Sequence, residues 1–263
     1  MNGTPIEQLF HISAKGADNP DCSVRAIDLL EREPMLGLLT RYGEMMKAHG
    51  LELAVSFFGV GLFGLVAANH WAMSRCGRLP DLSLVQLTVQ LEVRDYGGQF
   101  VFKLGDAAWT DLPENRREAF VEEAWVRYFQ EQLNPLVESA ASAAGLKSGL
   151  IWNQYGSTAA FYMDYIRETV PAGEELERCE ADFAILRGLP GSVFNRRSNP
   201  FRHTPRYAPN PFQPDKPIMI RSACCMYDKR ENGTKCYYCP IVSDSERAGL
   251  LAQYGAGGWA SKT

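Results

Sequence analysis

The sequence lacks the motifs that would give a nucleotide a binding site. No Gly-x-Gly-x-x-Gly follows a predicted strand and no P-loop is present, which excludes the usual dinucleotide and ATP sites. Histidine is scarce, and the four histidines show none of the spacings of a metal-ligand pair. The formal net charge of −4 has the wrong sign for a chain that coats nucleic acid, so we expect no nucleic-acid partner.

A secretory signal is also missing from the first residues. The stretch MNGTPIEQLFHISAKGADNPDC does not place a basic region before an apolar one. We therefore expect a cytoplasmic protein. In that compartment thiols stay reduced unless a metal ion holds them, which bears on every cysteine in the chain.

The longest uncharged apolar run is short for a membrane span. It covers residues 53–68, whereas a span needs about 20 residues. Glu52 precedes the run, and its three glycines suit close packing between helices. The run predicts a buried core helix that extends to Arg75, with weak membrane association as the alternative.

The periodicity of the remaining chain predicts an α+β fold that is predominantly helical with a small sheet. Residues 84–93 and 100–104 alternate around the turn DYGGQ and predict a β-hairpin. Helical spacing predicts helices over 23–49 with a break at Pro34, over 111–145 with a start at Asp111, over 146–169 and over 173–187. The first twenty residues look irregular, and a strand is expected over 218–223.

Two regions follow from this reading. Residues 1–105 form a helical region with the hairpin. Residues 106–263 form a second helical region, which contains a basic, proline-rich loop at 189–217 and a cysteine-rich segment at 218–241. One continuous domain is the alternative. Residues 241–263 could form a docking helix or a lid, or lack structure.

Four of the seven cysteines crowd into residues 222–240. Cys224 and Cys225 are adjacent, and Cys236 and Cys239 are separated by two tyrosines. Disulfides, a structural zinc site and an iron–sulfur cluster are all compatible with this density of thiols. Adjacent side chains in an extended chain point to opposite faces, so a single tetrahedral zinc requires the backbone to bend, whereas two irons spread the ligands over a larger object.

Positive charge is concentrated beside these cysteines. Residues 187–230 contain nine Lys or Arg against two Asp. A solvated basic surface is one interpretation, and a site for an anion or an acidic partner is the other. The candidates for such a site are Arg196, Arg197, Arg202, Arg206 and Arg221.

The cysteine pattern resembles a known signature. The run IMIRSACC, ten further residues and CYYCP make C-C-x10-C-x2-C, which is similar to the terminal signature of the FhuF-like ferric siderophore reductases. The stretch GLIWNQYGSTAAFYMDY (149–165) and the residues NPF (199–201) resemble the same family more loosely. The C-terminal domain of aerobactin-type siderophore synthetases is similar in fold but is not expected to carry the four cysteines.

The resemblance implies an activity, a cofactor with its ligands, a substrate and an electron donor. Cys224, Cys225, Cys236 and Cys239 would bind a [2Fe–2S] cluster that reduces siderophore-bound Fe(III) to Fe(II) in the cytoplasm. The substrate would be a ferric siderophore of the hydroxamate or carboxylate type, and the electron would come from a separate reductase or ferredoxin-type donor. The alternatives are a non-redox helical binding protein with a zinc knuckle and a general [2Fe–2S] electron carrier.

Overall fold

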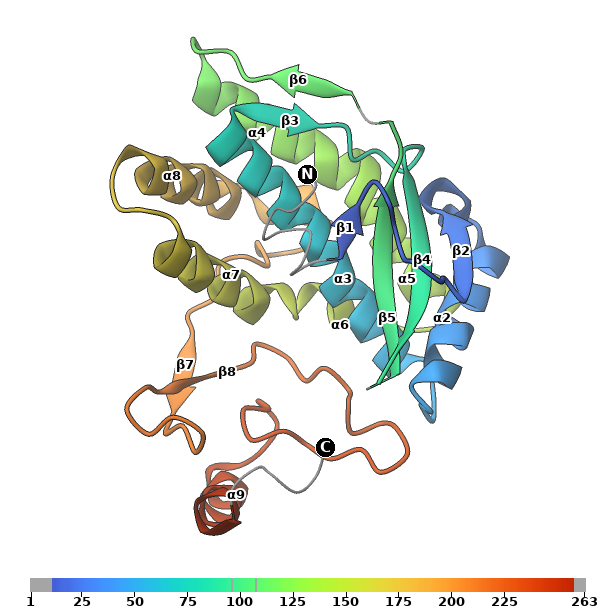
Figure 1. Ribbon diagram of the computed structural model, residues 1–263, viewed down its shortest axis with the longest axis vertical. Helices are drawn as coiled ribbons and strands as arrows, with labels where there is room; N and C mark the ends of the chain where they lie inside the picture. The colour runs from blue at the N-terminus through green and yellow to red at the C-terminus, as the bar shows by residue number, and fades with distance from the viewer. Residues whose placement is uncertain (1–10, 96, 107, 258–263) are drawn as a thin grey trace.

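The computed structural model describes residues 11–95, 97–106 and 108–257, and it has the predicted α+β class (Figure 1). The helices are α2 (Arg32–Met45), α3 (Glu52–Trp71), α4 (Arg117–Tyr128), α5 (Asn134–Ala143), α6 (Gly149–Trp152), α7 (Tyr155–Thr169), α8 (Glu174–Gly188) and α9 (Asp244–Gly257), with short 3-10 or π turns η1 (Ala26–Leu30), η2 (Ala72–Cys76), η3 (Phe129–Leu133) and η4 (Gly191–Phe194). The strands are β1 (Ile12–Ser13), β2 (Cys22–Arg25), β3 (Arg78–Pro80), β4 (Leu87–Arg94), β5 (Gly97–Leu104), β6 (Trp109–Asp111), β7 (Arg206–Ala208) and β8 (Ile218–Ile220).

The predicted hairpin is confirmed and forms the centre of a four-stranded sheet. Strands β4 and β5 pair antiparallel with Val89 opposite Phe102, and the sheet order is β1-β5-β4-β2. Both of these side chains are fully buried against the helices, because alternate residues of a strand face the same side. Strand β1 adds to the edge in parallel, so the chain is not irregular throughout its first twenty residues.

Helix α3 contains the apolar run and lies in the core, as expected. It and the following π turn form the one described helix long and apolar enough to cross a membrane, and 83% of its most apolar window is buried. Close packing explains one of its glycines: a Cβ at Gly59 would lie 2.7 Å from Cγ2 of Ile151 in α6. Residues on all faces of this helix are therefore packed against other parts of the fold.

Two predicted helix boundaries were wrong. Residues 22–30 form β2 and η1, and α2 starts only at Arg32, so Pro34 sits in its first turn instead of separating two helices. Proline is tolerated there because first-turn amides have no partner within the helix. Asp111 ends β6 and does not start a helix; α4 begins at Arg117. The strand expected over 218–223 is also shorter, Ile218–Ile220.

The core draws side chains from both predicted regions. Aromatic rings meet where α4–η3, α6–α7 and the chain after α8 converge, with Phe129 in contact with Phe194 at 4.6 Å and with Phe201 at 5.7 Å between ring centroids. Phe201 also packs on Tyr155 at 5.6 Å. This aromatic cluster fixes the end of α8 and the start of the proline-rich segment against α7.

The last part of the chain lies below this body in Figure 1. It comprises the β7–β8 hairpin, the cysteine-rich segment and α9. Its apolar contacts form two small clusters, one around Tyr237 and one around Cys224 and Cys239. These clusters are too small to order the segment alone, so its contacts with the body decide where the cysteines lie.

Candidate functional site

The four clustered cysteines come together in space. Cys224, Cys225 and Cys239 are buried and Cys236 is half-buried. Cys224 and Cys239 pack together in one buried cluster with Cys236 against it, and the Cys224 thiol donates to Asp228 Oδ1 at 3.8 Å. Cys236 also interacts electrostatically with Cys225. All seven cysteines lie in the described part of the chain and are free thiols.

The backbone bends at both cysteine pairs. Met226, directly after the adjacent cysteines, adopts a left-handed conformation with φ +62°, and its N–H donates to Cys224 Sγ at 3.4 Å. The N–H of Cys239 donates to the carbonyl of Cys236 at 3.0 Å, which closes the C-x2-C turn. Such a bend is what adjacent thiols need in order to serve a common site.

The junction of α6 and α7 anchors the first cysteine pair. The amide of the buried Gln154 donates to the carbonyl of Cys224 at 2.8 Å. Ser222 donates to the carbonyl of Asn153 at 2.6 Å and accepts from the N–H of Ser157 at 2.9 Å. The stretch 149–165, singled out in the sequence, therefore holds the cysteine-rich segment directly.

Gly156 in this junction is required by a close approach. A Cβ there would lie 2.7 Å from Cβ of His203 and 3.0 Å from Cβ of Ser222. Both distances are shorter than ordinary contact, so any larger residue would push the cysteine-rich segment away from α7.

The ten residues between the cysteine pairs are tied to the turn between α2 and α3. The N–H of His49 donates to the carbonyl of Lys229 at 2.9 Å, and the N–H of Glu231 donates to that of Lys47 at 3.0 Å. The Phe57 ring in α3 also lies 6.3 Å from that of Tyr227. The connection is thus held by main-chain bonds to a region about 180 residues away in the sequence.

Arg247 in α9 is a site residue that the sequence analysis missed. Its buried guanidinium donates to the carbonyls of Cys239 at 3.2 Å and Val242 at 2.9 Å, and also to that of Tyr237. It lies 5.7 Å from the Tyr237 ring centroid. A charged residue on a polar helix carries no sequence signal for this role, because its partners are backbone carbonyls.

A groove of about 920 Å³ opens beside two of the thiols. Cys225 and Cys236 both line it, as does Arg221. Arg221 lies 5.3 Å from the Tyr238 ring centroid, and its N–H donates to the Tyr238 carbonyl at 3.0 Å. Two thiols are therefore accessible from a concave surface that also holds a cation.

Burial dominates the acidity of the thiols. It raises the pKa of Cys224 to about 12, an effect that the Met226 N–H opposes and the neighbouring Cys239 thiol reinforces. Burial also raises the pKa of Cys236, and the Arg221 guanidinium opposes this rise. The thiols of Cys224 and Cys236 are thus protonated at neutral pH without a metal ion, and a metal would have to displace those protons.

Of the five candidate arginines, only Arg221 lines the groove. Arg196 donates to Asn153 Oδ1 at 2.8 Å, and Arg202 donates to the carbonyls of residues 187 and 188 at the end of α8. Arg197 and Arg206 are exposed, and neither lines the groove. A role for these four in ligand binding stays a prediction.

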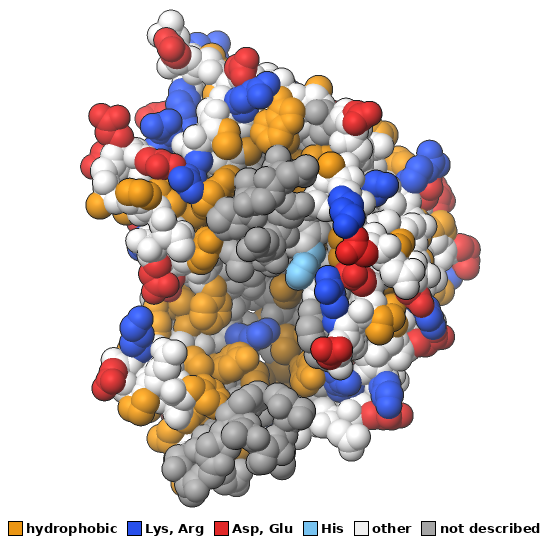
Figure 2. All heavy atoms as spheres, in the orientation of Figure 1, with side chains coloured by type: hydrophobic (Ala, Val, Ile, Leu, Met, Phe, Trp, Pro, Cys, Tyr) orange, Lys and Arg blue, Asp and Glu red, His pale blue; other side chains and the backbone are white. Residues whose placement is uncertain are grey.

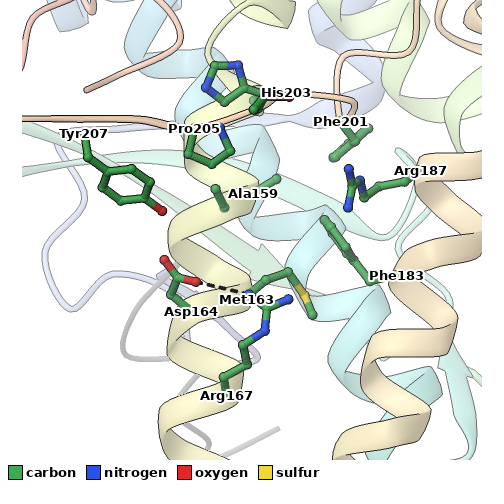
Figure 3. Close-up of a pocket in the computed structure, with 13 residues that line it drawn as sticks. Ala159, Met163, Asp164, Arg167, Phe183, Arg187, Phe201, His203, Pro205 and Tyr207 are labelled. Carbon is green, nitrogen blue, oxygen red and sulfur yellow. Dashed lines mark hydrogen bonds and ion pairs between the residues drawn. The ribbon is translucent and has the colours of Figure 1, made fainter. Parts of the chain in front are cut away.

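A second cavity, of about 300 Å³, lies between α7, α8 and residues 201–207. Figure 3 shows Arg187 beside Phe201 and Phe183, while Arg167 pairs with Asp164 at 3.1 Å. No cysteine is among its described lining residues. It is therefore separate from the thiol groove.

The donor set is four thiols within one small region of the structure. Among the described residues, no three His, Cys, Asp or Glu side chains are grouped as they would be around one metal ion. Cys224 interacts with both Cys239 and Cys225, and Cys236 interacts with both Cys225 and Cys224. Two irons with two protein thiolates each require four sulfurs but not their convergence on one point.

Comparison with known proteins gives no family assignment. No protein-family model matches the chain, and no curated protein matches it significantly. The resemblance to the siderophore reductases therefore rests on the cysteine signature and its associated segments.

Proposed function

We propose that this chain is a [2Fe–2S] protein that reduces siderophore-bound Fe(III) to Fe(II) in the cytoplasm. The observation that carries the proposal is the gathering of four thiols, two of which line an open groove. The chemistry that such a group supplies when bound is the transfer of one electron to Fe(III), after which a separate donor protein restores the electron. Hard oxygen donors hold Fe(III) far better than Fe(II), so this single electron is enough to loosen the chelate.

The protein side chains then have two tasks. Cys224, Cys225, Cys236 and Cys239 bind the irons. Arg221 places positive charge next to Cys225 and Cys236, which favours the more negative, reduced state. No side-chain acid, base or nucleophile is required, because the substrate gains an electron and no covalent bond to the protein is formed.

The test is direct electron delivery. We expect purified holoprotein to be red-brown and to bleach with dithionite. Mixed without oxygen with a panel of ferric hydroxamate and carboxylate siderophores, the reduced protein should regain its colour while Fe(II) appears in a ferrozine trap. The matched control is the metal-free protein, which should produce no Fe(II).

Two outcomes contradict this function in different ways. A colourless protein that contains zinc would support the zinc-knuckle binding protein. A red-brown protein that no ferric chelate reoxidises would support a general electron carrier with another partner.

A further inference from the structure

The groove beside the thiols is built from segments that are far apart in the sequence. Its walls come from the start of α3, the loop of the β7–β8 hairpin and both sides of the cysteine-rich segment. At about 920 Å³ it has the size of sites that bind a small molecule. Phe212, Arg221, Cys225, Tyr227, Lys235 and Cys236 are among the described residues that line it.

Aromatic side chains cover much of this wall and remain accessible. Phe212 is 42% exposed and Tyr227 is 39% exposed, although both are large and apolar. Figure 2 shows hydrophobic side chains around the hollow between the main body and the last segment, with a basic side chain among them. Accessible rings in a concave surface are typical of ligand sites rather than of plain surface.

The two charged side chains among the described lining residues of the groove are both positive. Arg221 and Lys235 line it, and no Asp or Glu is among its described lining residues. Neither cation forms an ion pair within 4.0 Å with a described carboxylate, although the charge of Lys235 reaches Glu246 in α9. Thiolates that carry irons add negative charge, so an anion could approach only where cations offset it. Lys235 and Arg221 line the groove beside Cys225 and Cys236 and can offset that negative charge.

We infer that this groove binds the ferric chelate itself and that Arg221 and Lys235 contact its carboxylates. The inference rests on the proposed function and adds the place and the substrate class: a chelate that carries carboxylates, with apolar arms against Phe212 and Tyr227. There the iron centre lies against the segment that contains Cys225 and Cys236. A ferric trihydroxamate without carboxylates gains the aromatic contacts but no charge-assisted hydrogen bonds.

Ga(III) chelates separate binding from reduction, because Ga(III) has the charge of Fe(III) and does not accept the electron. Holoprotein is titrated by calorimetry with the Ga(III) complex of a citrate-based dihydroxamate, which is anionic, and with that of a neutral trihydroxamate. Lys235→Gln should weaken the anionic complex about fivefold and change the neutral one less than about twofold. Phe212→Ala should weaken both complexes. Lys103→Gln, on the exposed face of β5, is the matched control and should change neither. The visible absorption of each variant reports that the metal site is intact.

The inference is overturned if the anionic complex fails to bind wild type, or if Lys235→Gln weakens both complexes equally. It is also overturned if Lys235→Gln leaves both affinities unchanged and slows only reduction by a donor protein, since the groove would then receive the donor. Reduction of ferric chelates without Ga(III) binding would remove the groove assignment and leave the function standing. Binding of the Ga(III) chelate without reduction of the ferric chelate would remove the reductase function and leave the groove as a chelate-binding site.

Discussion

At the scale of single residues, the site depends on side chains with different degrees of visibility in the sequence. The cysteines can be recognised in the sequence by their number and spacing. Gln154 and Arg247 donate to backbone carbonyls, and such contacts produce no recognisable sequence pattern. Gly156 belongs to the second kind, since only its neighbours His203 and Ser222 reveal why a side chain is excluded. The clustered cysteines can therefore be predicted from the sequence, whereas the residues that support them cannot.

Replacement of each clustered cysteine by serine tests the ligand set. In Cys224→Ser, Cys225→Ser, Cys236→Ser and Cys239→Ser we expect most of the visible absorption to be lost, because each thiolate fills one of four positions. Absorption spectra of the purified variants, with iron and sulfide content, provide the measurement. The controls are Cys22→Ser, Cys76→Ser and Cys179→Ser, which should keep their colour. An unchanged spectrum in Cys225→Ser would rule out four-cysteine ligation.

At the scale of elements, α9 contacts the cysteine-rich segment directly. Arg247 connects this helix to the turn that contains Cys239 through three carbonyl groups, two of them on residues that flank the thiol. The sequence of residues 241–263 is compatible with a docking helix, a lid or lack of structure. In the described part, Asp244–Gly257 form α9, whose Arg247 braces the turn that contains Cys239.

Loss of this brace should loosen the site. Arg247→Gln leaves buried carbonyls without their charged donor, so we expect about 2 kcal/mol or more of lost stability in this segment. Cluster loss in the presence of an iron chelator, followed as the decay of visible absorption, should accelerate by a factor of ten or more at about 1.4 kcal/mol per tenfold. Arg247→Lys keeps the charge but not the forked donor and should be intermediate. Equal decay rates for wild type and Arg247→Gln would assign Arg247 no such role. Arg197→Gln, at an exposed position, is the control.

The elements themselves were predictable to different degrees. The hairpin follows from its alternating pattern, α3 from its uncharged apolar run, and α8 and most of α7 from helical spacing. The start of α4 was misplaced because Asp111 and Pro113 have the composition of a helix start, but Asp111 instead pairs with Arg78 across strands β6 and β3. The short edge strands β1 and β2 were missed, since strands of two to four residues carry too little pattern. Sequence patterns reflect the local preference of a segment for helix or strand. The conformation of these segments is instead decided by the strands they pair with, which lie elsewhere in the sequence.

At the scale of the whole molecule, His70 links stability to pH. It is fully buried in α3, with Nε2 donating to the carbonyl of Cys179 at 2.8 Å and Nδ1 lying 2.7 Å from the Tyr162 hydroxyl. Burial lowers the pKa of His70 to about 4, because the charged ring would be desolvated. The core therefore accepts this histidine only in its neutral form.

Acid should weaken the fold through this residue. Below a pH of about 6.5 the unfolded chain binds a proton at His70 that the folded chain does not bind until a pH of about 4, so the free energy of unfolding falls across that window. The loss is about 3 kcal/mol in full. Urea unfolding of holoprotein between pH 7.5 and pH 4.5 should show a smaller decrease in His70→Asn than in wild type. His49→Asn, at an exposed position, should follow wild type. Parallel curves for wild type and His70→Asn would contradict the assignment.

The main-chain bonds between residues 47–49 and residues 229–231 also set an order of events during synthesis. The ribosome releases the α2–α3 turn and the α6–α7 junction long before the cysteine-rich segment appears. We expect these receiving surfaces to be folded when the thiols emerge, so that the thiols reach their positions by docking onto them. Under the proposed function, iron is then delivered to a body that is nearly complete. A defect in α7 or in the α2–α3 turn would then appear in cells as a protein that accumulates without iron rather than as one that fails to accumulate.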